Sequence, residues 1–144
     1  MRNDILPSPC LSEKEARLVG ALELAYLGDT IYDLTVRTRL IGSGNVKEIH
    51  RAAVLEVNAT AQAAAARRIL PLLSEEEQDV YHRGRNAHAR HQAPKAASVS
   101  DYAASTGLES LLGYLYLIGH FERINELFGA MARPAEECPP KEDP

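Results

Sequence analysis

Hydrophobic positions along the chain recur at helical spacing, and we find no stretch with the alternation typical of a β-strand. The first helical run begins near Glu13, because Ser12 and Glu15 form a capping-box pattern, and Gly42–Asn45 ends it. Its apolar residues recur at helical spacing, at Leu18, Leu22 and Ala25 and on through Ile31, Leu34 and Leu40. Because the run is long and largely apolar, we expect it to be the central, buried helix.

Capping residues divide the next part of the chain into further helices. The alanine-rich segment 46–70 has a strong helix propensity, and Asn58 could cap a second helix within it. Ser74 with Glu77 is another capping-box pattern, and it opens an acidic helix that runs to about Arg83 or beyond. These signals predict up to three helices here.

A basic segment and two more helices complete the predicted domain. Residues 83–95 lack apolar periodicity and contain Gly84 and Pro94, so we expect the end of the acidic helix and a loop there. Ser98 or Ser100 caps the next helix, which ends at Gly119, and a short helix covers 120–131. The sequence therefore predicts an all-α domain over residues 12–131, an extended lead-in at 1–11 and a disordered tail at 132–144.

Composition narrows the class of protein. A chain of 144 residues is long enough for one core, and its net charge of −4 argues against a surface coated in basic residues. Cys10 and Cys138 lack metal-ligand spacing and are interpreted as free thiols, with a disulfide between them as the alternative. Because no apolar run reaches membrane-spanning length and Met1–Cys10 lacks a signal-peptide pattern, we expect a cytoplasmic protein without a membrane partner.

Two acidic residues stand within apolar helical runs. Asp29 lies in 24–33 and Glu109 in 105–117, where a buried carboxylate needs a hydrogen bond, an ion pair or a metal. Asp29 could instead satisfy a nearby helix terminus, and Glu109 could pair with an arginine in the core or at a dimer contact. Taken together, they suit Mg²⁺, which binds through one or two carboxylates and keeps several waters. Asp33 and Thr106 share helix faces with Asp29 and Glu109, and are candidates for supporting roles.

The segment 83–95 carries a positive charge, although the protein as a whole is acidic. It contains no acid, and its candidate RNA-binding residues are Arg83, Arg85, Asn86, His88, Arg90 and Lys95. Arginine and lysine there could bind phosphates, whereas the alternative is a solvated loop. Zinc is disfavoured, because no Cys or acid lies at ligand spacing from the histidines. Scattered cations elsewhere, including Lys47, are interpreted as ordinary surface charge.

These motifs resemble those of the ribonuclease III superfamily. The segment 24–29, LAYLGD, is similar to its signature helix, and 108–117, LESLLGYLYL, to its second catalytic helix; RGRNA at 83–87 resembles the Mini-III branch more narrowly. On this resemblance Asp29 and Glu109 are the catalytic and metal-binding acids. Two further acids of the larger enzymes are replaced here by Ala25 and Thr106, a departure that the Mini-III branch shares.

The resemblance also implies an activity and partners. It implies an all-α homodimer that cuts double-stranded RNA with Mg²⁺, for which Mn²⁺ could substitute, and that leaves 5′-phosphate ends. The branch implies precursor large-subunit ribosomal RNA as the substrate. The alternatives are a non-catalytic double-stranded-RNA-binding ribosome-assembly factor on the same fold and a purely structural helical dimer.

Overall fold

Seven α-helices and one short 3₁₀ helix make up the fold in the part of the chain that the structure, a computed structural model, describes: residues 9–88 and 98–132. The elements are α1 (Glu13–Arg17), α2 (Ala21–Leu40), α3 (Val46–Glu56), α4 (Ala59–Ile69), η1 (Leu70–Leu72), α5 (Glu75–His88), α6 (Val99–Leu117) and α7 (Phe121–Ala132). No strand occurs within those residues, so the all-α prediction is confirmed. The predicted lead-in lies mostly outside them, and the tail almost wholly so.

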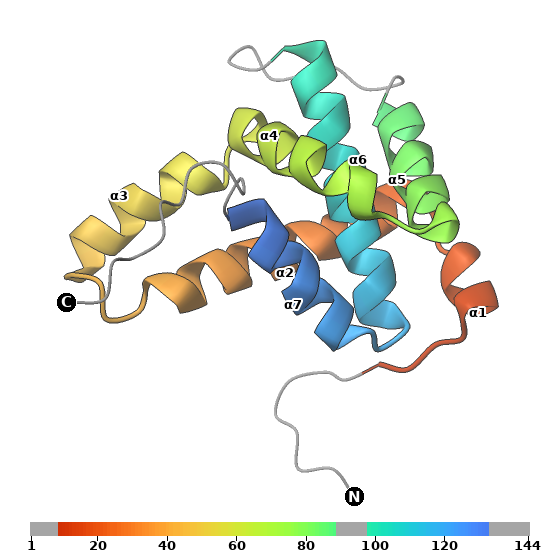
Figure 1. The fold of residues 1–144 in the computed structure, drawn as a ribbon, viewed down its shortest axis with the longest axis horizontal. Helices are drawn as coiled ribbons and strands as arrows, with labels where there is room; N and C mark the ends of the chain where they lie inside the picture. Colours follow the sequence, from red (N-terminus) through yellow and green to blue (C-terminus); the bar gives the residue numbers. More distant parts are fainter. Residues whose placement is uncertain (1–8, 89–97, 133–144) are drawn as a thin grey trace, which may run out of the picture.

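Helix α6 is the centre of the domain. It runs through the middle of the bundle and packs against α2, α4, α5 and α7 (Figure 1). Twelve of its 19 residues are buried, which makes α6 and not α2 the central buried helix. The expectation for α2 is wrong because much of α2 lies at the surface, where Leu22, Tyr26 and Leu34 are exposed.

The predicted helix over 13–40 is interrupted at Leu18–Gly20. Ser12 and Glu15 form the expected capping box, with Ser12 Oγ accepting from the Glu15 amide at 3.1 Å. After one turn the backbone bonds tighten to i−3 spacing at Leu18 and Val19, and Gly20 is extended and begins α2. Gly20 is the N-cap of α2, a position where glycine is tolerated.

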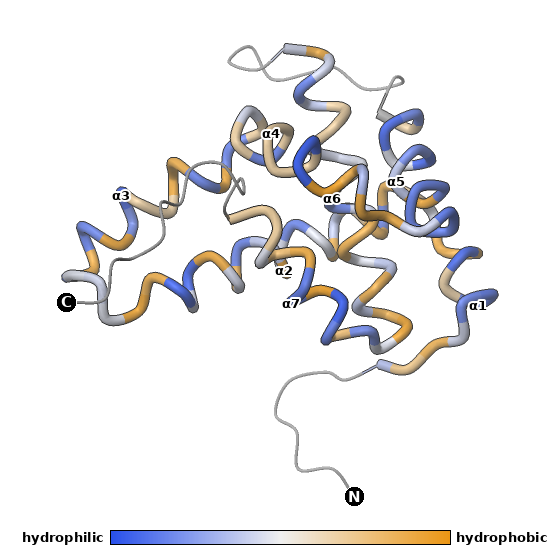
Figure 2. The backbone as a smooth tube through the Cα atoms, in the orientation of Figure 1, coloured by the Kyte–Doolittle hydropathy of each residue, from blue (hydrophilic) through white to orange (hydrophobic). Residues whose placement is uncertain are grey.

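The other caps lie at the predicted positions. Asn58 accepts from the Ala61 amide at 2.8 Å and separates α3 from α4, and Ser98 caps α6. Ser74 and Glu77 cap α5 reciprocally. Helix α5 then continues to His88, so its end falls within the predicted segment 83–95, and residues 83–88 are helix and not loop. Figure 2 shows α5 as mostly hydrophilic. Its buried residues form one narrow face: Glu77, Val80, Tyr81 and Gly84.

Helix α5 continues past Arg83 because Gly84 fits against α6. A Cβ atom at Gly84 would lie 2.3 Å from Ser110 Oγ and 3.1 Å from the Gly107 Cα. The absence of a side chain therefore lets the two helices pack closely where the sequence suggested a break. Arg90 and Lys95, in the rest of the basic segment, lie outside the described residues.

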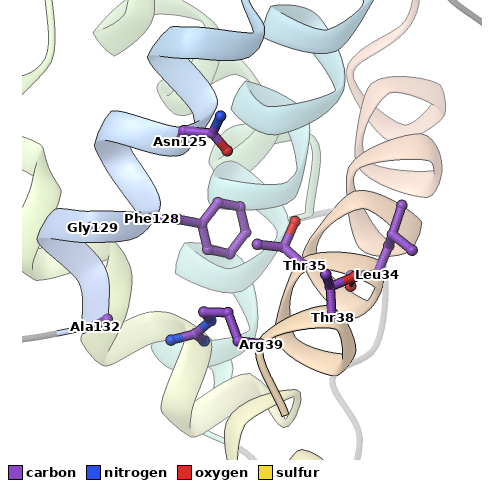
Figure 3. Close-up of a pocket in the computed structure, with 8 residues that line it drawn as sticks. All are labelled: Leu34, Thr35, Thr38, Arg39, Asn125, Phe128, Gly129 and Ala132. Carbon is purple, nitrogen blue, oxygen red and sulfur yellow. Dashed lines mark hydrogen bonds between the residues drawn. The ribbon is translucent and has the colours of Figure 1, made fainter. Parts of the chain in front are cut away.

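A cavity of about 490 Å³ lies between α2 and α7. Figure 3 shows the Phe128 ring pointing from α7 towards Thr35 and Thr38 of α2, with Arg39 and Asn125 at its border. Neither Asp29 nor Glu109 lines it. Every helix in the described parts of the chain is too short or too polar to cross a membrane.

Candidate active site

The candidate site is built on the crossing of α2 and α6. At this crossing Gly28 faces the backbone of Glu109, and a Cβ atom on Gly28 would lie 1.7 Å from the Glu109 carbonyl oxygen. Likewise, a Cβ atom on Gly113 would lie 2.1 Å from the Leu24 carbonyl oxygen. The two glycines let the helix backbones touch, and this contact carries Asp29, the residue after Gly28, to Glu109.

Glu109 is a half-buried carboxylate on α6. Burial and the negative charge of Asp29 raise the pKa of Glu109 to about 7, although a hydrogen bond from Ser105 opposes the shift. The two acids that stand 80 positions apart in the sequence thus lie close enough to repel each other. Excess negative charge at a partly desolvated position favours a bound cation.

Asp29 is at the surface, contrary to the expectation of a buried acid. The residue is exposed, but partial desolvation and the charge of Asp33 raise the pKa of its carboxyl group. Asp33 accepts a hydrogen bond at 2.9 Å from Arg37 on the same helix. The site is therefore one half-buried and one exposed carboxylate, open to solvent on the side of α2.

Thr106 is buried and donates its hydroxyl proton to the Tyr102 carbonyl oxygen at 3.0 Å. Ala25, one turn before Asp29, is also buried and offers no ligand atom. The described residues contain no group of three or more His, Cys, Asp or Glu side chains that could enclose a metal. Two carboxylates that repel each other fit a hard, hydrated divalent cation better than a metal that requires a full protein cage.

The candidate RNA-binding residues of α5 differ in their exposure to solvent. Arg83 is half-buried and donates to the Arg17 carbonyl oxygen at 3.3 Å, so part of its hydrogen-bonding capacity serves the fold. Arg85 and Asn86 are exposed on α5. His88 is the last residue of this helix. Of the candidate RNA-binding residues whose exposure the structure describes, Arg85 and Asn86 lie at the surface.

Two polar residues beside Glu109 were missed by the sequence analysis. Ser105 lies one turn before Glu109 on α6 and is within 3.0 Å of its Oε1 atom. Gln62 projects from α4, and its amide group contacts the Ser105 hydroxyl. The i−4 spacing of Ser105 could have indicated its role. For Gln62 the one signal was a single glutamine in an alanine-rich helix.

The chain resembles known proteins over most of its length. A family model described as the ribonuclease III domain matches residues 22–120. A Mini-ribonuclease 3 from Symbiobacterium thermophilum is 53% identical over 113 residues, which cover 77% of this chain and 86% of the relative. A Mini-ribonuclease 3 from a Thermoanaerobacter species is 40% identical over 129 residues, which cover 88% of this chain and 90% of the relative.

A solved structure agrees with these sequence matches. The crystal structure of a protein from Fusobacterium nucleatum superposes with a TM-score of 0.73 and 29% sequence identity, covering 80% of this chain and 93% of that protein. The family match contains both halves of the α2–α6 crossing, with Asp29 and Glu109. The chain belongs to the ribonuclease III family of endoribonucleases, within its Mini-ribonuclease 3 branch.

Proposed function

We propose that this protein is a Mg²⁺-dependent endoribonuclease that cleaves double-stranded RNA. The observation that carries the proposal is the pairing of Asp29 and Glu109 across the glycine contact of α2 and α6. Two acids held together against their repulsion indicate a site built for a cation. The exposed position of Asp29 leaves one side of the site accessible to a substrate as large as a duplex.

Asp29 and Glu109 would hold the cation through their carboxylate oxygens, and Mn²⁺ could replace Mg²⁺ there. When bound, the cation supplies activation of the attacking water and stabilisation of charge at the scissile phosphate. Only two protein carboxylates are available, so we expect weak metal binding in the absence of RNA. Thr106 keeps an acceptor lone pair and Asp33 lies one turn from Asp29, so both remain candidates for secondary roles.

We further propose that the enzyme works as a homodimer, since a two-fold pair presents two sites to the two strands of a duplex. Leu22 and Tyr26 are exposed one turn apart on α2, and Tyr26 is 85% exposed. Large exposed apolar residues beside a site support a protein contact there. The occupant of this surface is a second copy of the chain.

The substrate we propose is precursor large-subunit ribosomal RNA. The support is the resemblance of RGRNA at 83–87 to the Mini-III branch, which implies this substrate; the relatives' name, Mini-ribonuclease 3, supports only the branch itself. The alternative, a non-catalytic double-stranded-RNA-binding assembly factor, is disfavoured by the presence of both acids. Such an assembly factor would bind duplex RNA but would not cleave it at any Mg²⁺ concentration.

Cleavage of a duplex RNA by Asp29→Asn and Glu109→Gln tests the activity. Both substitutions keep the size of the side chain and remove its charge, so we expect folded proteins that bind RNA but have lost most cleavage. Arg39→Gln, on the far end of α2, is the control and should cut at the wild-type rate. Wild-type cleavage by either acid variant would refute the role of that acid. Mapping ends on precursor ribosomal RNA then tests the substrate.

The oligomeric state is tested separately by sedimentation equilibrium. Tyr26→Arg should convert the dimer to monomer, since a charge would be buried at the contact. Val99→Arg, which charges an exposed apolar residue at the start of α6, should leave the dimer intact. A wild-type protein that sediments as a monomer at all concentrations would contradict the proposal.

A further inference from the structure

A row of polar side chains leads through the core from α4 to Glu109. Gln62 and Ser105 are 3% and 1% exposed, so neither can hydrogen-bond to bulk water. The Ser105 Oγ atom lies 3.0 Å from Glu109 Oε1 and also contacts the amide group of Gln62. Three polar side chains from α4 and α6 therefore meet in a buried row that ends at the candidate metal-binding carboxylate.

The number of available protons decides which group donates in each hydrogen bond of this row. As placed, the Ser105 hydroxyl faces two acceptors, Gln62 Oε1 and Glu109 Oε1, but it carries a single proton. The ionised carboxylate that a cation requires has no proton to contribute. The oxygen and nitrogen of a glutamine amide are assigned from the hydrogen bonds that they make. With Nε2 towards Ser105, Gln62 donates to Ser105, and Ser105 donates to Glu109, so both contacts are satisfied.

We propose that Ser105 and Gln62 are positioning residues for Glu109: Gln62 fixes the Ser105 hydroxyl, which donates to one carboxylate oxygen and leaves the other oriented for a divalent cation. This inference rests on the proposed function. The inference deepens that function, because it assigns the support of the metal site to two buried residues, Gln62 of α4 and Ser105 of α6. Such outer partners hold a ligand in one rotamer, and their loss commonly weakens metal affinity about 10- to 100-fold.

The row also explains why a glutamine lies in the alanine-rich helix α4. Its neighbours Ala63, Ala65 and Ala66 are buried and apolar, and a buried amide is costly unless it is hydrogen-bonded. An apolar residue would fill the position at a lower cost to folding. A hydrogen bond that holds Ser105, 43 positions later in the sequence, accounts for the glutamine.

Mn²⁺ binding to the RNA-free protein, measured by electron paramagnetic resonance of the free ion, tests the proposal. We expect Ser105→Ala and Gln62→Met each to weaken Mn²⁺ binding about 10-fold or more. Because Gln62 acts through Ser105, the double variant should bind Mn²⁺ no more weakly than Ser105→Ala alone. The half-saturating Mg²⁺ concentration for RNA cleavage should rise in parallel.

Ser110→Ala is the matched control. Ser110 is a buried serine of the same helix, and its hydroxyl contacts the Ala21 and Thr106 carbonyl oxygens and not a carboxylate. We expect this variant to lose stability in thermal unfolding but to keep wild-type Mn²⁺ affinity. Equal Mn²⁺ affinity in wild type, Ser105→Ala and Gln62→Met would overturn the positioning role, as would an equal weakening by Ser110→Ala.

The test separates this inference from the proposed function. If Glu109→Gln abolishes Mn²⁺ binding while Ser105→Ala leaves it unchanged, the metal site stands and the positioning role is wrong. If Mn²⁺ binding in wild type does not depend on Asp29 or Glu109, the proposed metal site itself is refuted. Should Gln62→Met fail to fold, Ser105→Ala alone decides, because it removes one atom from the core.

Discussion

Gly28 lies against the backbone of Glu109, so that a Cβ atom on Gly28 would be 1.7 Å from the Glu109 carbonyl oxygen. The contact joins backbone to backbone, and neither partner can move aside as a flexible side chain would. The same residue pair therefore governs two properties: how closely α2 packs on α6, and how close Asp29 comes to Glu109.

Gly28→Ala should destabilise the protein and reduce its activity. The added methyl group forces the two helices apart, and overpacking of a tight contact costs about 1–3 kcal/mol, or more where backbone must shift. Gly129→Ala is the control: the site is in α7, nothing lies within 4 Å of its Cβ position, and the change should stabilise by about 0.5–1 kcal/mol. Urea unfolding of both variants measures the difference, and an unchanged midpoint for Gly28→Ala would contradict the close contact.

Stability without metal should depend on pH through Glu109. Its carboxyl has a pKa raised from 4.5 to about 7 in the folded state, so the native protein holds this proton more tightly than the unfolded chain does. The resulting stabilisation is complete below pH 4.5 and is lost as the pH rises to about 7, with a total on the order of 3 kcal/mol.

The comparison with Glu109→Gln isolates this effect. In EDTA, the free energy of unfolding of the wild type should fall relative to that of the variant as the pH rises from 5 to 8. Mg²⁺ should reverse the trend above pH 7, because it binds the ionised carboxylate. Parallel pH profiles for the two proteins in EDTA would show that burial and Asp29 do not shift this group.

The starts of α1, α4, α5 and α6 could be predicted because capping is local. Ser12, Asn58, Ser74 and Ser98 each bond to an amide three positions ahead, so the pattern is contained in four residues of sequence. The two acids could also be identified, since a charge in an apolar run requires an explanation whatever the fold. Local rules thus placed the elements and indicated the site.

Relations between distant segments could not be predicted in the same way. The apolar content of α2 suggested a central helix, but exposed Tyr26 shows that an apolar residue can lie on a surface. Gly84 resembled a helix end because its neighbour, Ser110 on α6, is not visible from the sequence. Gln62 contacts Ser105 across 43 positions, and only the folded chain brings them together.

Breaking the ion pair of Arg123 and Glu77 should cost more than breaking a surface pair. Arg123 donates to both carboxylate oxygens of Glu77 at 2.9 Å and to the Leu72 carbonyl oxygen, and the Glu77 side chain is 9% exposed. Burial acts to raise the pKa of Glu77, but the Arg123 hydrogen bonds and the Ser74 cap outweigh it and lower that pKa. Arg123→Met leaves this carboxylate unpaired, so we expect a loss of about 3 kcal/mol in urea unfolding.

The matched control for that prediction is Arg39→Met. Arg39 pairs with Glu56 at 3.0 Å, but both side chains are 44% exposed, and such pairs contribute about 0–1 kcal/mol. The wild type should also lose its advantage over Arg123→Met at acid pH, because a lowered Glu77 pKa stabilises only while the group is ionised. Equal losses for the two variants would contradict the structural role of the Glu77 pair.

Arg85→Ala should weaken binding to duplex RNA without weakening the fold. Arg85 is exposed on α5, in the positively charged segment of this acidic protein. Each phosphate contact contributes about one unit to the slope of log K against log[salt]. We therefore expect lower affinity for every duplex sequence and a shallower salt slope in a titration monitored by fluorescence anisotropy. Lys47→Ala on α3 removes an exposed cation outside that segment and should change neither quantity. If the two variants bind alike, the basic residues of α5 have no special part in holding RNA, and the duplex must be bound through another surface.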